Sequence, residues 1–147
     1  MLNYKIAIVG LGYIGLPLAV EFGKIFNVIG FDLKKIRINQ LKNNIDITKE
    51  VSKANLKSAK KLSFTNDLNS IKNCNVYIIC VPTPIDNANR PNLYHLKKAS
   101  YEIGRMLKKE DIVIFESTVF PGATEEICVP ILSKESNLTY NKDFFCG

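Results

Sequence analysis

The chain has 147 residues, 46% hydrophobic and 23% charged, which is the balance of an ordinary soluble globular protein with one domain and a substantial core. No apolar run reaches the length of a membrane span, and the N-terminus lacks a secretory pattern, so we expect a cytoplasmic protein with no membrane partner. The net charge of +6 comes from scattered Lys and Arg residues without interleaved aromatic residues, which indicates a solvated basic face and no nucleic-acid groove.

Apolar runs of strand length alternate with segments of helical periodicity along the chain. In chain order the sequence predicts strands at residues 5–9, 27–32, 62–65, 75–81 and 111–116, and helices at 13–26, from 33 to 41, after 48, from 93 to 107 and at 124–133. The second helix is expected to place Leu33, Ile36, Gln40 and Leu41 along one stripe. Pro130 is expected to kink or shorten the last helix. Apolar strands separated by helices predict an α/β fold of the Rossmann type, a doubly wound parallel sheet in three layers.

The residues after the first strand form a complete G-x-G-x-x-G motif, Gly10-Leu11-Gly12-Tyr13-Ile14-Gly15. Gly10 would permit a sharp turn, Gly12 would let a pyrophosphate approach the backbone, and Gly15 would let the helix pack closely on the sheet. The free N–H groups at the helix start favour phosphate binding. A glycine motif alone is weak evidence for a dinucleotide site.

Asp32 ends the second apolar strand and strengthens that interpretation. A carboxylate there would accept hydrogen bonds from the ribose hydroxyls and would repel a 2′-phosphate, which favours NAD over NADP. The alternative is that Asp32 only caps the next helix.

Two further stretches follow strands directly, where ligands bind on parallel sheets. The two prolines of Val81-Pro82-Thr83-Pro84 predict a rigid loop that would hold Thr83 beside the cofactor, and the polar stretch 85–90 beyond it is a lid or an idle surface loop. Glu116-Ser117-Thr118 ends the next strand, and its hydroxyls would contact nicotinamide, substrate or water, or else cap the following helix.

The cysteines and the single histidine limit the chemistry that the chain can support. Cys74, Cys80, Cys128 and Cys146 form no C-x-x-C pair, and His95 is the only histidine. A zinc site or a Cys–His hydrolase therefore has almost nothing to be built from, and we expect no metal and four reduced structural thiols.

Four stretches together resemble the nucleotide-sugar 6-dehydrogenases, the UDP-glucose/GDP-mannose dehydrogenase family, in its N-terminal NAD-binding domain. They cover nearly the whole chain and read "IAIVGLGYIGLPLAVEFGK", "VIGFD", "IICVPTP" and "IVIFESTVFPGATEEICVPIL". The "ESTVFPGATEE" form is most similar to the branch that oxidises UDP-N-acetylhexosamines for bacterial surface polysaccharides, including Vi-antigen-type enzymes.

The resemblance implies roles for individual residues. The pyrophosphate would be held by Gly10, Gly12, Tyr13, Ile14 and Gly15, and the adenosine ribose by Asp32 and Arg37. The nicotinamide side would be lined by Val81, Pro82 and Thr83, with Ser117 also at the cofactor. Thr118 matches a family threonine that orders a catalytic water near the sugar C6. The family oxidises the C6 alcohol of a UDP-sugar to a carboxylate with two NAD⁺, through a cysteine thiohemiacetal and thioester, and full-length members are expected to be homodimers.

The family's catalytic cysteine, its lysine–asparagine pair and its "SPE" glutamate lie downstream of residue 147, and residues 143–147 resemble the sixth strand that leads toward that glutamate. We therefore expect residues 1–147 to be the NAD-binding domain, without the central and C-terminal sugar-binding domains, and to be inactive alone. Two alternatives are a stand-alone NAD(H)-sensing Rossmann domain, as in the gating domains of potassium transporters, and a β-hydroxyacid dehydrogenase. The "VPTP" loop and the "EST" strand end argue against both.

Overall fold

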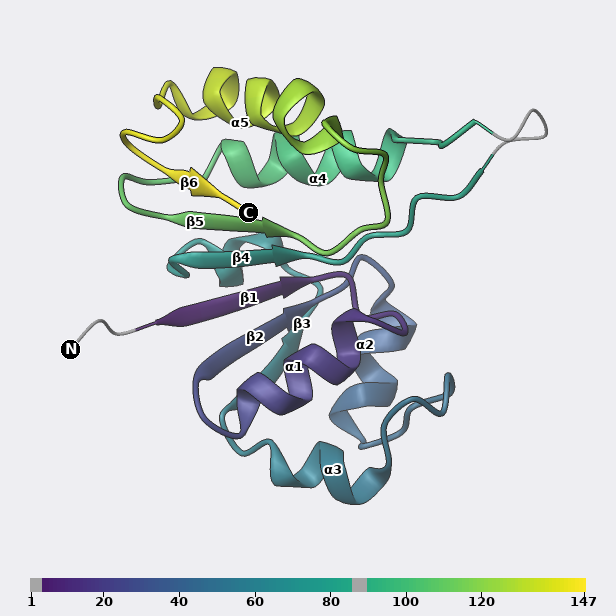
Figure 1. The fold of residues 1–147 in the computed structure, drawn as a ribbon. Helices are drawn as coiled ribbons and strands as arrows, with labels where there is room; N and C mark the ends of the chain where they lie inside the picture. The colour runs from purple at the N-terminus through teal and green to yellow at the C-terminus, as the bar shows by residue number, and fades with distance from the viewer. Residues whose placement is uncertain (1–3, 86–89) are drawn as a thin grey trace.

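The computed structural model describes residues 4–85 and 90–147 (Figure 1). Within them, six strands form one parallel sheet in the order β3-β2-β1-β4-β5-β6, the order of a Rossmann fold. The elements are β1 (Lys5–Val9), α1 (Gly15–Gly23), β2 (Asn27–Phe31), α2 (Lys35–Lys42), α3 (Lys53–Ser58), β3 (Leu62–Thr65), the 3₁₀ turn η1 (Leu68–Ile71), β4 (Val76–Ile79), α4 (Tyr94–Gly104), β5 (Ile112–Phe115), the π-helical segment η2 (Thr124–Cys128), α5 (Val129–Ser136) and β6 (Phe145–Cys146).

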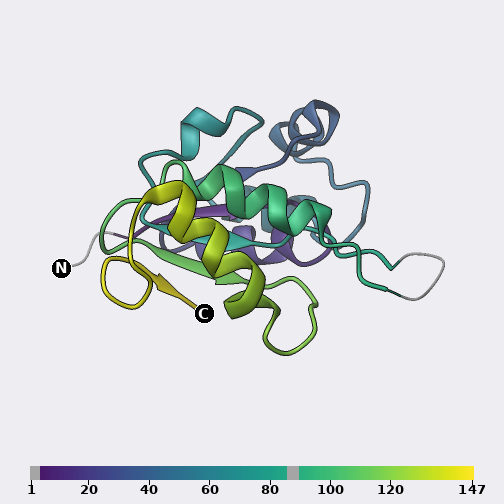
Figure 2. The same cartoon turned by 90° about the horizontal axis from the view of Figure 1, so that it is seen from above.

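Helices cover both faces of the sheet, because the strands carry apolar side chains on both sides. α1, α2 and α3 lie against one face and α4 and α5 against the other, where Figure 2 shows the latter two side by side. Each face has its own core: Ile8 and Leu16 belong to the cluster under α1, and Ala7 and Leu132 to the cluster under α4 and α5. The predicted three-layer α/β fold is confirmed.

The parallel strands bring their carboxyl ends to one edge of the sheet, on the right in Figure 1. Hydrogen bonds continue past the strand ends and hold the following loops level with one another. Gly10 donates to the Phe31 carbonyl (2.8 Å), Cys80 to the Val9 carbonyl (2.8 Å), and Glu116 to the Ile79 carbonyl (2.9 Å). The glycine motif and the two polar loops therefore share this carboxyl edge.

The five strands predicted from the apolar runs, and the sixth that the family resemblance implies, all match strands of the structure, whereas two helix predictions need correction. The predicted stripe on the second helix is wrong, because Leu33 and Ile36 are 66% and 74% exposed, and the buried face of α2 is made of Arg37, Ile38 and Leu41. Leu33 precedes the helix, which begins only at Lys35, and Ile36 lies on its solvent side.

Pro130 does not kink a continuous helix as predicted. The π-helical segment η2 ends at Cys128, and α5 begins at Val129 with Pro130 in its first turn, where a missing N–H does no harm. The change of helical register therefore comes just before the proline. The short turn η1 between β3 and β4 is not predicted from the sequence.

Candidate functional site

Two of the three motif glycines are required by the protein's own backbone. Gly10 has a φ of +97°, and a Cβ there would lie 2.8 Å from the Cys80 carbonyl oxygen. A Cβ at Gly15 would lie 1.8 Å from the Gly10 carbonyl oxygen, which is far inside any allowed contact. These positions match the turn and packing roles predicted for them.

Gly12 differs, because a Cβ at this position would meet nothing within 4 Å. The first hydrogen bond of α1 runs from the Leu16 N–H to the Gly12 carbonyl (3.1 Å), so the preceding N–H groups of the turn have no intrahelical acceptor. Tyr13 beside it is 65% exposed, and Ile14 is the N-cap residue of α1. The open space in front of Gly12 and the helix N-terminus fits an approaching phosphate.

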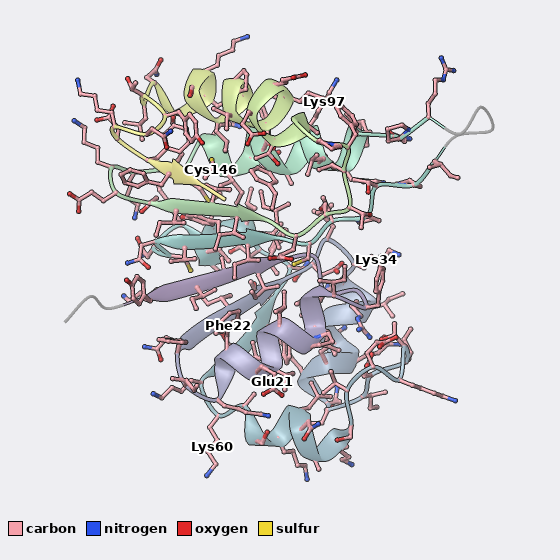
Figure 3. All side chains as sticks on the ribbon, viewed as in Figure 1. Glu21, Phe22, Lys34, Lys60, Lys97 and Cys146 are labelled. Carbon is pink, nitrogen blue, oxygen red and sulfur yellow. The ribbon has the colours of Figure 1, made fainter. Side chains whose placement is uncertain are left out.

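The Asp32 carboxylate ties this turn to the end of β2. Its Oδ2 accepts a hydrogen bond from the Leu11 N–H (3.0 Å), and its Oδ1 accepts one from the Lys34 N–H (2.9 Å). Lys34, labelled in Figure 3, is the N-cap residue of α2, so Asp32 supports the helix start without being its N-cap. A carboxylate has about four acceptor positions, so lone pairs remain for ribose hydroxyls.

Arg37, predicted at the adenosine ribose, is only 7% exposed and is directed into the protein. Its Nε donates to the Leu11 carbonyl (3.0 Å), its Nη1 to Asp46 Oδ1 (2.7 Å) and its Nη2 to the Thr48 hydroxyl (3.4 Å). Asp46 was not identified from the sequence. An Asp two residues before a Thr signals a local turn, and nothing in that signal predicts a partner nine residues away.

We call these groups, Gly10–Gly15, Asp32, Arg37 and Asp46, the glycine-turn side. The remaining predicted residues, Val81, Pro82, Thr83, Ser117 and Thr118, lie at the same edge after β4 and β5, and we call them the hydroxyl side.

Hydroxyl–carbonyl hydrogen bonds connect the two loops of the hydroxyl side. Ser117 Oγ donates to the Val81 carbonyl (2.7 Å), and Thr83 Oγ1 donates to the Thr118 carbonyl (2.6 Å). Thr83 Oγ1 also lies 3.3 Å from Thr118 Oγ1. Because the one Thr83 proton is used on the carbonyl, Thr118 is the donor in this second contact, which leaves its lone pairs available as acceptors. Such a hydroxyl is suited to accept a hydrogen bond from water.

None of the four cysteines has the character of a nucleophile. Burial raises the pKa of Cys74 to about 11 and, together with Glu116, that of Cys80 to about 12. Burial likewise raises the pKa of Cys128, and that of Cys146 on β6 to about 12 (Figure 3). A thiol attacks only as thiolate, so these groups stay protonated and unreactive near neutral pH.

The comparisons with known proteins agree with this geometry. The model of the UDP-glucose/GDP-mannose dehydrogenase family, NAD binding domain, matches residues 4–145. The chain belongs to this family. The match confirms the resemblance that the sequence indicates and the expected cofactor, NAD. We refer to the chain below as the NAD-binding domain.

Relatives within the family share much of the sequence. A UDP-N-acetyl-D-glucosamine 6-dehydrogenase of Pseudomonas aeruginosa is 58% identical, in a match that covers 100% of this chain and 35% of the relative. A second such enzyme, of Salmonella typhi, is 54% identical, in a match that covers 97% of this chain and 34% of the relative. Among solved structures, the UDP-D-ManNAc dehydrogenase of Pyrococcus horikoshii has a TM-score of 0.90 at 33% identity, over 97% of this chain and 35% of that one. The chain thus spans about a third of the length of the relatives it matches.

Two further observations bear on the predicted partners. In the described part of the chain no helix is long and apolar enough to cross a membrane, and no group of three metal-ligating side chains gathers. Figure 3 shows Lys60 and Lys97 at opposite ends of the view, so these two lysines do not share a patch.

Proposed function

We propose that this NAD-binding domain serves a dehydrogenase that oxidises the C6 alcohol of a UDP-N-acetylhexosamine to a carboxylate with two NAD⁺, for surface polysaccharide synthesis. The observation that carries the proposal is the 58% identity to a UDP-N-acetyl-D-glucosamine 6-dehydrogenase over the whole chain, together with an open glycine turn. The sugar-binding domains and the catalytic cysteine would belong to other parts of the enzyme.

The domain's own residues would divide the work along the carboxyl edge. Gly12 and the N-terminus of α1 would receive the pyrophosphate, with Gly10 and Gly15 shaping the turn and Tyr13 and Ile14 flanking it. Asp32 would bind the adenosine ribose and disfavour a 2′-phosphate.

The hydroxyl side would position the nicotinamide and the reacting sugar carbon. Val81, Pro82 and Thr83 would line the ring, with Ser117 holding the Val81 carbonyl in place. Thr118 would accept a hydrogen bond from the catalytic water, since its proton is directed to Thr83. Bound NAD⁺ supplies hydride acceptance, and the domain supplies orientation.

The cofactor part of the proposal is tested by titrating the 147-residue chain with NAD⁺ and NADP⁺ in a calorimeter. We expect NAD⁺ to bind at least about tenfold more tightly, a difference of about 1.4 kcal/mol. Equal affinities, or no binding of NAD⁺, would contradict the role of Asp32 or of the site as a whole.

The catalytic part is tested by mixing the chain with NAD⁺ and UDP-N-acetylglucosamine or UDP-N-acetylgalactosamine. We expect no NADH above background, because a thiol that stays protonated cannot trap an aldehyde. A full-length dehydrogenase that carries this domain should instead release two NADH per sugar and prefer these substrates to UDP-glucose. Two NADH per sugar from the 147-residue chain would place the nucleophile among its own cysteines.

A further inference from the structure

We propose that Asp46 is a positioning residue for cofactor binding, holding the Arg37 guanidinium so that Arg37 in turn holds the Leu11 peptide of the glycine turn. The inference deepens the proposed function, since it rests on NAD binding at that turn. Asp46 lies between α2 and α3, 14 residues beyond Asp32, outside every motif that the sequence indicates.

The surroundings of Asp46 leave it no role in direct contact with a ligand. Its side chain is 1% exposed, and its Oδ1 accepts the Arg37 Nη1–H (2.7 Å) and the Thr48 hydroxyl (2.7 Å). The same oxygen accepts the Thr48 N–H (3.1 Å), and Oδ2 accepts the N–H groups of Glu50 (2.9 Å) and Val51 (3.0 Å). Protein donors surround the carboxylate, so Asp46 acts on the site only through Arg37.

Arg37 connects this carboxylate to the turn. Its side chain is 8% exposed, and its Nε–H binds the Leu11 carbonyl at 3.0 Å. The Leu11 N–H binds Asp32 at 3.0 Å. The peptide units on both sides of Leu11 are therefore held by charged side chains, a carboxylate on the N–H and a guanidinium on the carbonyl.

The contact between Arg37 and the Leu11 carbonyl fixes the direction of the neighbouring Gly12 N–H. The Leu11 carbonyl and the Gly12 N–H belong to one trans peptide, in which the two point in opposite directions. With the carbonyl fixed on Arg37, the Gly12 N–H is directed away from Arg37, and a Cβ at the same residue would meet nothing within 4 Å. Fixing this peptide in advance spares bound NAD the cost of ordering it.

Charge supports the same assignment. Burial raises the pKa of Asp46, but hydrogen bonds from Thr48, Arg37 and the Val51 backbone outweigh it and lower the pKa to about 2. Asp46 is thus ionised at neutral pH. Its removal would leave the Arg37 guanidinium buried without its anionic partner, and such a group moves toward water or another anion.

The experiment compares Asp46→Asn with Asp111→Asn, a matched control. Asp111 is also buried, at 4% exposure, and its carboxylate accepts the Lys108 N–H (2.8 Å) at the amino end of β5, away from the glycine turn. NAD⁺ affinity is measured by calorimetry well below the melting temperature of each variant. We expect Asp46→Asn to weaken NAD⁺ about tenfold, because binding must then order the Leu11 peptide, and Asp111→Asn to leave the affinity unchanged.

An amide spectrum of the free protein reports the geometry directly. We expect the Gly12 and Leu11 N–H resonances to shift in Asp46→Asn and to stay in place in Asp111→Asn. If Asp46→Asn does not fold, Thr48→Val removes one hydrogen bond from the same carboxylate and should weaken NAD⁺ about twofold to threefold. Unchanged Gly12 resonances and affinity in the folded variant would overturn the inference.

The path through Arg37 is tested in an Arg37→Met background. If Asp46 acts through Arg37, Asp46→Asn should cause no further loss of NAD⁺ affinity there. The same tenfold loss in both backgrounds would overturn the path. A wild-type chain that does not bind NAD⁺ refutes the proposed function instead, and the Gly12 resonances then still decide whether Asp46 positions the turn.

Discussion

The glycine-turn side and the hydroxyl side meet at one edge of the sheet but are stabilised by different interactions. On the glycine-turn side, the buried ion pair between Arg37 and Asp46 and the Asp32 carboxylate hold backbone groups in place. On the hydroxyl side, neutral hydroxyls bind carbonyls across two loops, and Thr118 is exposed. Under the proposed function, the adenosine half of the cofactor would meet a site set by buried charge, and the nicotinamide half would meet one set by weaker neutral contacts.

The largest expected effect is on the glycine-turn side, where one substitution should greatly weaken ligand binding without affecting folding. Gly12→Val should lower NAD⁺ affinity about a hundredfold or more, because its side chain fills the space for the pyrophosphate, and should leave the melting temperature unchanged because no protein atom is in the way. Calorimetry and a thermal melt check both.

Gly15→Ala is the matched control for that change. Its Cβ would lie 1.8 Å from the Gly10 carbonyl oxygen, so we expect a strongly destabilised chain. A Gly12→Val variant that binds NAD⁺ normally would show that the open space at Gly12 is not the pyrophosphate site.

Next in size is the loss of the Asp32 carboxylate. Asp32→Ala should weaken NAD⁺ at least about tenfold, since charge-assisted hydrogen bonds contribute about 1.5–3 kcal/mol each. It should also lower the melting temperature, because the Leu11 and Lys34 N–H groups lose their acceptor. Parallel titrations with NADP⁺ should show the discrimination between the cofactors shrinking. Equal NAD⁺ affinities of wild type and variant would reduce Asp32 to a structural residue.

A pH titration of stability tests whether the charge of Asp46 stabilises the glycine-turn side. The pKa of Asp46 lies at about 2 in the folded protein, below its ordinary 3.8, so its contribution to stability is fully present above pH 3.8. That contribution is lost as the pH falls from 3.8 toward 2. The stability difference between wild type and Asp46→Asn, from urea unfolding, should therefore shrink over this range. A difference independent of pH there would contradict the assignment.

The smallest effect is expected on the hydroxyl side. Thr83→Val removes the hydrogen bond to the Thr118 carbonyl and should cost about 1 kcal/mol of stability, with NAD⁺ affinity changing less than about threefold. Thr118→Val should likewise leave NAD⁺ affinity nearly intact, because its predicted partner is a water. A tenfold loss of affinity from either variant would make the two sides energetically alike.

The difference between the sides also explains what the sequence alone could predict. The apolar strands, the glycine motif and Asp32 are each marked by the residues of a short local segment, so periodicity and spacing predict them directly. The buried face of α2 could not be predicted, because a charged residue, Arg37, takes a position that a hydrophobic pattern assigns to solvent. Its partner Asp46 follows a loop in which Asn44 has a φ of +57°, and the path of such a loop depends on tertiary contacts.

Leu11, the second residue of the glycine motif, belongs at once to the cofactor turn and to the hydrophobic core. Its side chain is 1% exposed and packs beside Gly30 of β2, while its N–H is bound to Asp32. We therefore expect exchange of this amide hydrogen with solvent to require opening of the hydrophobic cluster under α1, and to be as slow as exchange in the central strands. The amides of Gly12 and Tyr13, one and two residues away, should exchange within the dead time of the measurement. Protection of the amides from exchange would thus end between Leu11 and Gly12, in the middle of the motif.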